Sequence, residues 1–406
     1  MTTRAEPVEV DPFAEENQLQ PWLDKGAQLS DSDLKELGLD TQRIIDPHHH
    51  LFNFVDGGIS TAPDASKGSE ESGKDESKKN PLPALFYETF GRRLQVSVPY
   101  EAKALNKDIN RLNVRGTVFI ECGSYYDMEA PEHLRSVGET VKVNEIAKSC
   151  PIIGNQIRVP SMAMEESKLE EVLDAHAKAS TIVKLTGVRD PVAKIDPRMQ
   201  GKVRTAMDHN IPYEHLASDE YARGAKVLER RGLTLDLYLF YHQLPMAAQL
   251  ARKVPNLRLV IDHCGGLIGD QEYAKPEVQQ QMREEWEKSI EELASIPNVR
   301  IKLGGILMSY CGLGFDEKET APSAQEVADA QYPWMSFIID KFGVDRCIFE
   351  SNFPMDRVSV SYENCFASFM LIAKRYGCSA EDIDKMFYSN AVETYQLNVP
   401  ETPNKL

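Results

Sequence analysis

Paired cysteines, long apolar runs and an excess of basic residues are all missing from this sequence. Its seven cysteines are scattered without a C-x-x-C pair, which argues against a disulfide framework or a zinc ribbon and favours a reducing compartment. No apolar run approaches the length that crosses a membrane. The formal net charge is −17, and an acidic surface repels nucleic acid and anionic lipid. We therefore expect neither a nucleic-acid nor a membrane partner.

Targeting signals are scarce as well. The first ten residues, Met1 to Val10, are charged and lack the apolar stretch of a secretory signal, which favours a cytoplasmic protein. The last three residues, Asn404-Lys405-Leu406, end in the Lys-Leu of a peroxisomal signal but differ from it at the first position. A peroxisomal location is therefore the weaker alternative.

What the sequence does have is length, with 406 residues of which 42% are hydrophobic. Such a chain can bury a large core without disulfides or a structural metal. Residues 1–42 are polar and acidic, and we interpret them as an N-terminal arm with one short helix near Ser30 to Leu37. Residues 55–80 are rich in Gly, Ser and charged residues, which predicts a flexible insertion. A solvated loop is favoured here over a cover for the pocket.

From residue 43 to residue 400, short β-branched runs alternate with charged amphipathic stretches. Strands are predicted over Ile44–Asp46, Gly116–Glu121, Ile152–Val159, Ile182–Leu185, Leu233–Leu239, Leu257–Asp262, Val299–Leu303 and Cys347–Glu350. Helices are predicted between them, for example over Glu165–Lys178, Tyr221–Arg231, Pro276–Ala294 and Trp334–Phe342. This alternation implies parallel strands with right-handed crossovers, and eight such units close a single-domain (β/α)₈ TIM barrel. An open doubly wound sheet is the alternative, but no G-x-G-x-x-G motif opens a helix.

Polar residues follow most of the predicted strands. In a (β/α)₈ barrel the catalytic groups lie at the carboxyl ends of the strands, so these residues should meet at one face. They are His48, His49 and His50 after the first strand, Glu121, Arg158, Arg189, His242 and His263 after later ones, and Glu350, Asn352 and Asp356 after the eighth.

The spacing His48-x-His50 favours a metal site. Residues two apart on a strand point to the same side, so both imidazoles can face the barrel mouth while His49 points away. With His263 they would form a three-histidine cluster. His242 is a further candidate for catalysis or substrate binding, and the alternative is a lone loop histidine bonded to the backbone.

Several ordered segments resemble one known family. They are Asp46-Pro47-His48-His49-His50-Leu51, Val118–Cys122, Gly187-Val188-Arg189, Ile261–Gly266, Lys302–Gly305 and Phe349–Pro354. Together they are similar to the amidohydrolase-related family, and most similar to its branch of sugar lactonases and pyrone-dicarboxylate lactonase. The resemblance runs from about Arg43 to about Leu397. It is specific for the family and much less specific for a substrate.

The resemblance implies roles for individual residues. His48 and His50 would be the strand-one metal pair, His263 the strand-six histidine and His242 a strand-five ligand, holding a divalent metal for which zinc is the best guess. Metal-dependent members usually end strand eight in an Asp, but this position holds Asn352. An amide is a weak ligand and cannot act as a base. The branch also contains members that work without a metal, so both chemistries stay open.

Arg158 and Arg189 would lie on neighbouring strands at the barrel mouth. A guanidinium holds a carboxylate through two hydrogen bonds, so both are candidates for binding an acidic substrate. The alternative for Arg189 is a rim salt bridge with Asp190 or Asp196. Strand lysines such as Lys302 receive no role, because they do not align with the metal-bridging lysine of related enzymes.

We therefore predict a hydrolase of a small carboxylated substrate, with a lactone or an ester as the best guess. A metal ion, or the histidine cluster with Arg189, would polarise the carbonyl, and Glu121, Glu350 or Asp356 would activate water. A non-oxidative decarboxylase is the second hypothesis, and a barrel without catalysis that acts as a binding protein is the third. The expected partner is a small-molecule substrate, and assembly as a homodimer is left open.

Overall fold

The computed structural model describes residues 16–53, 89–90 and 99–400, without the side chains of residues 16–18. The insertion predicted at residues 55–80 lies outside the described residues. Within the described ranges, no helix is both long and apolar enough to span a membrane.

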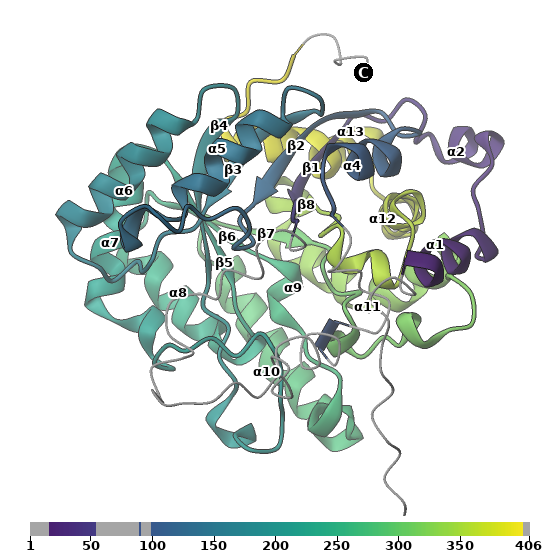
Figure 1. The fold of residues 1–406 in the computed structure, drawn as a ribbon. Coiled ribbons are helices and arrows are strands. Elements are labelled where there is room, and N and C mark those ends of the chain that lie inside the picture. Colours follow the sequence, from purple (N-terminus) through teal and green to yellow (C-terminus); the bar gives the residue numbers. More distant parts are fainter. Residues whose placement is uncertain (1–15, 54–88, 91–98, 401–406) are drawn as a thin grey trace, which may run out of the picture.

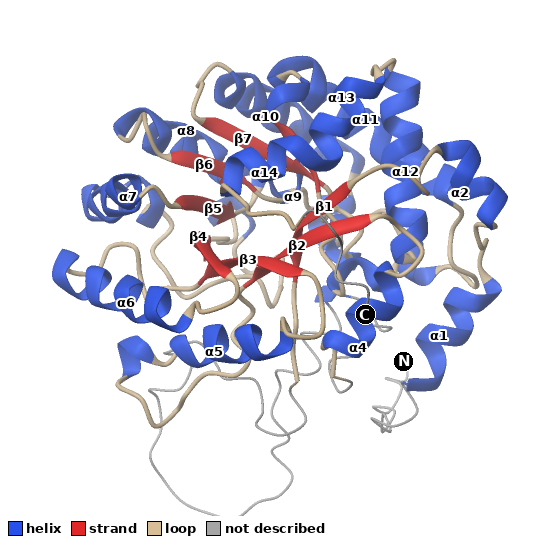
Figure 2. Cartoon of the chain, turned by 90° about the horizontal axis from the view of Figure 1, so that it is seen from above, coloured by secondary structure: helices blue, strands red, loops and turns tan. Residues whose placement is uncertain are grey.

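Eight parallel strands form one sheet whose order follows the chain. Their bounds are β1 Ile44–His49, β2 Val114–Ile120, β3 Ile152–Ile157, β4 Lys184–Pro191, β5 Thr234–Tyr238, β6 Arg258–Ile261, β7 Val299–Leu303 and β8 Cys347–Phe349. A parallel bridge between His49 and Phe353 joins the first strand to the segment that follows the last. Seen from above in Figure 2, the strands lie in the middle and the helices surround them. The predicted (β/α)₈ barrel is confirmed.

Strand β4 differs most from its prediction. The sequence favours a strand over Ile182–Leu185, whereas β4 runs over Lys184–Pro191. A side chain at Gly187 would place its Cβ 2.3 Å from the carbonyl oxygen of Thr234. The glycine that looks like a strand breaker is therefore what lets β4 pack closely against β5. The shift places Arg189 inside the strand, with its side chain buried.

Helices cover the outside of the barrel (Figure 1). Their bounds are α1 Glu16–Lys25, α2 Asp31–Leu37, α4 Ala102–Ile109, α5 Val137–Ile146, α6 Glu166–Ala179, α7 Asp219–Arg231, α8 Leu244–Lys253, α9 His263–Gly266, α10 Pro276–Ala294, α11 Ala324–Phe342, α12 Tyr362–Tyr376, α13 Ala380–Asp384 and α14 Asn390–Tyr395. Helices α6, α7 and α10 confirm three of the predictions. Helix α11 begins earlier than Trp334, because Ser323 and Glu326 form a capping box and the helix continues through Pro333.

The N-terminal segment contains two helices. Helix α2 confirms the predicted short helix, and a capping box between Ser30 and Asp33 sets its start. Helix α1 packs through a small apolar cluster that includes Trp22 and Ala321. The Trp22 Nε1 group donates a hydrogen bond to the carbonyl of Lys318 (2.8 Å). The arm is thereby attached to the loop between β7 and α11.

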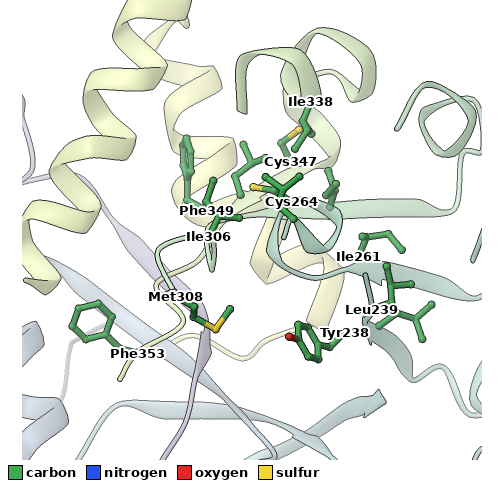
Figure 3. Packing of buried hydrophobic residues seen from close by; sticks show 14 of the residues in the cluster. Tyr238, Leu239, Ile261, Cys264, Ile306, Met308, Ile338, Cys347, Phe349 and Phe353 are labelled. Atoms are coloured by element: carbon green, nitrogen blue, oxygen red, sulfur yellow. The ribbon is translucent and has the colours of Figure 1, made fainter. Parts of the chain in front are cut away.

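Apolar side chains fill the space between the sheet and the outer helices. Figure 3 shows Cys264, Ile338 and Cys347 close together, on α9, α11 and β8. All three are buried. The ring of Phe349 stacks on that of Phe369 in α12, with centroids 4.8 Å apart. These contacts fix the ends of β6 and β8, which carry polar residues into the barrel mouth.

Candidate active site

The barrel closes where β1 meets the segment that follows β8, and we call this contact the seam. The two sequence motifs Asp46–Leu51 and Phe349–Pro354 form it. The main-chain N–H of His50 donates to Phe353 O (2.7 Å), and that of Asn352 donates to His48 O (2.9 Å). Asp46 reinforces the seam, because its carboxylate accepts hydrogen bonds from the Ser351 hydroxyl (2.6 Å) and main-chain N–H (3.1 Å). The seam therefore places the histidines of β1 beside the residues that follow β8.

The three consecutive histidines alternate in direction as the spacing predicts. His48 and His50 point to the same side, with their Nε2 atoms 3.3 Å apart. His49 points away, and its Nε2 lies 2.9 Å from the Thr117 hydroxyl. Its ring meets Phe119 edge-on, with centroids 6.1 Å apart. His49 is thus part of the packing around the barrel, and His48 and His50 belong to the interior.

Hydrogen bonds define where the protons of His48 and His50 lie. Lys302 Nζ can only donate, and it lies 3.1 Å from His48 Nδ1. The carbonyl of Ile120 can only accept, and it lies 3.0 Å from His50 Nδ1. The consistent assignment puts a proton on His48 Nε2, which donates to His50 Nε2. Glu350 Oε2 lies 2.8 Å from His48 Nδ1, so this nitrogen has an alternative acceptor if its proton moves there.

His263 and Glu350 form a pair at the ends of β6 and β8. Glu350 Oε1 lies 2.8 Å from His263 Nδ1 and also accepts the His263 main-chain N–H (3.0 Å). The Nε2 atom of His263, on the other side of the ring, therefore keeps its lone pair. Gly305 makes the pairing sterically feasible, since a Cβ there would lie 1.9 Å from His263 Nδ1. The two glycines that follow β7, Gly304 and Gly305, thus leave the space that Glu350 and His263 occupy.

A buried ion cluster, which the sequence did not predict, lies beneath the histidines. Lys302 Nζ lies 2.8 Å from Asp236, 3.0 Å from Asp262 and 3.7 Å from Glu350, and all four residues are buried. Burial disfavours the ammonium, but attraction to the carboxylates outweighs it and raises the pKa of Lys302. Burial raises the pKa of Asp236 to about 6 despite Lys302. At neutral pH three carboxylates therefore face one ammonium.

The donor set of this site fits a divalent cation. Two nitrogens bound to one tetrahedral zinc at about 2.0–2.1 Å lie roughly 3.3 Å apart, which matches the separation of the His48 and His50 Nε2 atoms. Among the described residues, His48, His263 and Glu350 also place ligand atoms within 4.8 Å of one another. The excess of buried negative charge around Lys302 calls for a further cation.

A cavity of about 200 Å³ opens beside the histidines, and His50 and His263 line it. Six of the residues singled out in the sequence line it, namely His50, Glu121, Arg158, Arg189, His263 and Asn352. Arg189 Nη1 lies 3.3 Å from Glu121 Oε1, and Arg158 Nη1 lies 3.9 Å from Glu121 Oε2. The ion pair of Arg189 is thus made with Glu121. Neither Asp190, which accepts from the Tyr221 hydroxyl, nor Asp196, which pairs with Arg198, takes the place expected for a rim salt bridge.

Four of the proposed residues do not line the cavity, and the fully buried His48 is one of them. Asp356 is buried, and its Oδ1 accepts from Asn352 Nδ2 (2.9 Å). Burial raises the pKa of Asp356 to about 7, against the lowering effect of Asn352. Glu350 is buried behind the histidines. His242 is not among the residues that line the cavity, and its Nδ1 lies 2.9 Å from the Tyr213 hydroxyl.

His209 lines the cavity and was missed in the sequence. Its Nε2 is buried without a hydrogen-bond partner among the described residues. Burial lowers the pKa of His209 to about 3, and the neighbouring Arg158 and Arg189 act in the same direction. The ring is therefore neutral at physiological pH and offers one free nitrogen to a ligand. Nothing in the long β4–α7 loop distinguishes it from other loop histidines, so only the fold reveals it.

Solved structures share this architecture. An amidohydrolase from Burkholderia multivorans matches 87% of this chain and 99% of its own with a TM-score of 0.61 and 16% identity. A second crystal form described with bound zinc gives a TM-score of 0.60. At this level of identity the similarity shows the fold.

Sequence relatives match parts of the chain. Protein y4mH of Sinorhizobium fredii is 30% identical over 178 residues, which are 44% of this chain and 52% of that protein. An L-fucono-1,5-lactonase of Burkholderia ambifaria is 31% identical over 31% of this chain and 37% of its own. An L-rhamnono-gamma-lactonase of Scheffersomyces stipitis is 20% identical over 72% of this chain and 88% of its own. The chain thus spans about half or less of the length of the first two relatives.

The family model described as amidohydrolase matches residues 163–397. That is more than half of the 406 residues, and it contains the strands from β4 to β8 with His263, Lys302 and Glu350. The chain belongs to the amidohydrolase family.

Proposed function

We propose that this protein hydrolyses a small lactone that carries one carboxylate. The observation that carries the proposal is the cavity in which Arg158 and Arg189 face the histidine cluster. The two guanidinium groups share a single carboxylate, that of Glu121, so the pocket keeps one net positive charge for an anion. The lactonase names of two relatives support the lactone.

The histidine cluster would act on the carbonyl. His48, His50 and His263 would hold a divalent cation, for which zinc is the proposed identity because a neighbouring structure is described with it. Such a cation supplies Lewis-acid polarisation of the carbonyl oxygen when bound. With a cation at Nε2, the proton of His48 would lie on Nδ1 and donate to Glu350, as that of His263 does, so Glu350 would orient both rings.

Other residues of the cavity would bind the substrate and handle the proton. Arg189 would hold the carboxylate, with Arg158 beside it. Glu121 would accept a proton from the attacking water, because it is the one candidate carboxylate that lines the cavity and its Oε2 has no hydrogen-bond partner among the described residues. The neutral ring of His209 would hydrogen bond to a substrate oxygen. Asn352 would orient water through its Oδ1, since its Nδ2 group already donates a hydrogen bond to Asp356.

Hydrolysis of a matched pair of lactones tests the function and the role of Arg189. We expect the wild type to open a carboxylated δ-lactone with a lower KM than its methyl ester, as followed by acid release in a pH-stat. Arg189→Met should raise KM for the free acid by about 10- to 100-fold, the range for losing a hydrogen bond to a charged group. KM for the ester should stay unchanged. Equal effects on both would contradict carboxylate recognition, and no hydrolysis of either would contradict the lactonase.

Metal binding gives a second test, independent of the substrate. Protein purified without added metal should contain about one equivalent of a divalent cation. Glu350→Gln should weaken the affinity by about 10- to 100-fold, because it removes the acceptor that orients His48 and His263. Competition with a chelating dye measures this. Glu363→Gln is the control, since Glu363 pairs with Arg111 at the surface. Full affinity in the Glu350 variant would show that this carboxylate does not support the ligands.

A further inference from the structure

A second cavity lies beside the first at the carboxyl end of the barrel. Its volume is about 280 Å³. It is formed by the loop after β2, which carries Tyr126 and Arg135, and by the segment after β3, which carries Arg158 and leads to Lys168 in the first turn of α6. Arg158 lines both cavities. The outer cavity is otherwise made of residues that the proposed reaction does not use.

Two cations of the outer cavity, Arg135 and Lys168, have no ion-pair partner in the part of the chain that the structure describes. Among the described residues, neither Arg135 nor Lys168 has a carboxylate within 4.0 Å, and Arg158 comes no closer than 3.9 Å to Glu121. The Nε atom of Arg135 is buried without a hydrogen-bond partner in the described part of the chain. A buried donor on a cation costs free energy unless an acceptor satisfies it. Glu132 is the one acidic residue among those that line the cavity.

Part of the remaining lining is apolar, next to the polar Glu132, His133 and Ser136. The apolar part consists of Tyr126, Met128, Val159 and Pro160. A cavity lined by three cations and by aromatic and aliphatic side chains matches a ligand with an anionic head and an apolar body.

We propose that this outer cavity binds a small organic anion, with a carboxylate or phosphate head held by Arg135, Lys168 and Arg158. Its body would lie against Tyr126 and Met128. The outer cavity shares Arg158 with the substrate pocket but has Arg135 and Lys168 to itself, so anion binding there can be tested without the lactonase reaction. Carboxylates and phosphate monoesters share the chemistry that the guanidinium groups recognise, and the probes below distinguish them.

Calorimetric titration with benzoate, phenyl phosphate and the neutral benzyl alcohol tests the proposal. We expect saturable binding of at least one anion and none of the alcohol. The double variant Arg135→Met/Lys168→Met should bind at least about tenfold more weakly, because charge-assisted hydrogen bonds are lost. Lys178→Met is the control, since Lys178 is exposed at the other end of the same helix. The preferred anion identifies the head group.

Arg189→Met separates the two cavities, because Arg189 lines the substrate pocket alone. Binding that survives in Arg189→Met and is lost in the double variant supports the outer site. Binding that is lost in Arg189→Met and retained in the double variant places the anion in the substrate pocket and overturns the proposal. Equal binding of benzyl alcohol, or no saturable binding of either anion, also overturns it. If the double variant does not fold, the single change at the exposed Lys168 serves in its place.

Discussion

Replacement of Lys302 by Met should lower the free energy of unfolding by about 3–5 kcal/mol, the range for removing one partner of a buried ion pair. Lys302 is fully buried and is the ammonium that Asp236, Asp262 and Glu350 share. Methionine has a similar volume, so the loss would come from electrostatics and not from an empty space. Urea denaturation of chelator-treated protein measures it, so that no bound cation replaces the ammonium.

The pH dependence of the Lys302→Met deficit distinguishes charge from packing. Without Lys302, burial should raise the carboxylate pKa values in the folded state above those of the unfolded chain. The unfolded state then binds fewer protons, so stability falls as pH rises. The deficit should be larger at pH 8 than at pH 5. Lys253→Met, which breaks an exposed pair with Asp219, should cost less than about 1 kcal/mol. A deficit independent of pH would argue against the ion cluster as its cause.

Glu121→Gln should lower kcat by a factor on the order of 10²–10⁴, the usual contribution of general base catalysis. The same change removes the counter-charge of Arg189, so the carboxylated substrate should bind no more weakly, and KM should stay level or fall. A smaller folded fraction would also lower the apparent kcat without raising KM, so the rates must be referred to the amount of folded protein. Initial rates on the carboxylated lactone, with circular dichroism to verify folding, provide the measurement.

Glu139→Gln is the matched control for Glu121. Glu139 Oε1 accepts the main-chain N–H groups of Cys122 (3.2 Å) and Ser124 (3.0 Å) and does not line the cavity. Burial, followed by the charge of Glu121, raises the pKa of Glu139 to about 8. It is thus already protonated at neutral pH, and an amide should change kcat little. If Asp356→Asn lowers kcat more than Glu121→Gln does, the proton acceptor lies behind Asn352 instead.

Much of the barrel could be predicted because each strand is a local, apolar signal. The exception, β4, contains Gly187 and ends in Arg189-Asp190-Pro191, a composition typical of a turn. Only its close contact with Thr234 makes glycine the fitting residue for a strand. The spacing of His48 and His50 predicted their common direction because alternation along a strand is a local property.

The ion cluster could not be predicted in the same way. Asp236 is the one charged residue of β5, and Lys302 is one of two in β7, with Arg300. Either could have been a surface residue on an edge. Their partnership depends on barrel closure, which brings β5, β6, β7 and β8 together around one point. Opposite charges at interior positions of two strands are a signal that a search for paired charges would have found. His242 lies in a short helical turn after β5, Tyr241–Gln243. The sequence does not indicate the direction of this turn, so it could not show that His242 stays out of the cavity lining.

The seam between β1 and β8 has a consequence for how this site can diverge. Asn352 is held by its main-chain N–H on His48 O, and His50 by its main-chain N–H on Phe353 O. Neither bond involves a side chain, but position 352 has a φ of 54°, which Asn, Asp and Gly adopt more readily than other residues. Asn352 Nδ2 donates to the buried Asp356 carboxylate (2.9 Å), so an aspartate in its place would fit only with one of the two carboxyl groups protonated. One substitution at this position would therefore change the contact with Asp356 and the number of protons that the pocket holds, while the main-chain bonds of the seam could stay as they are.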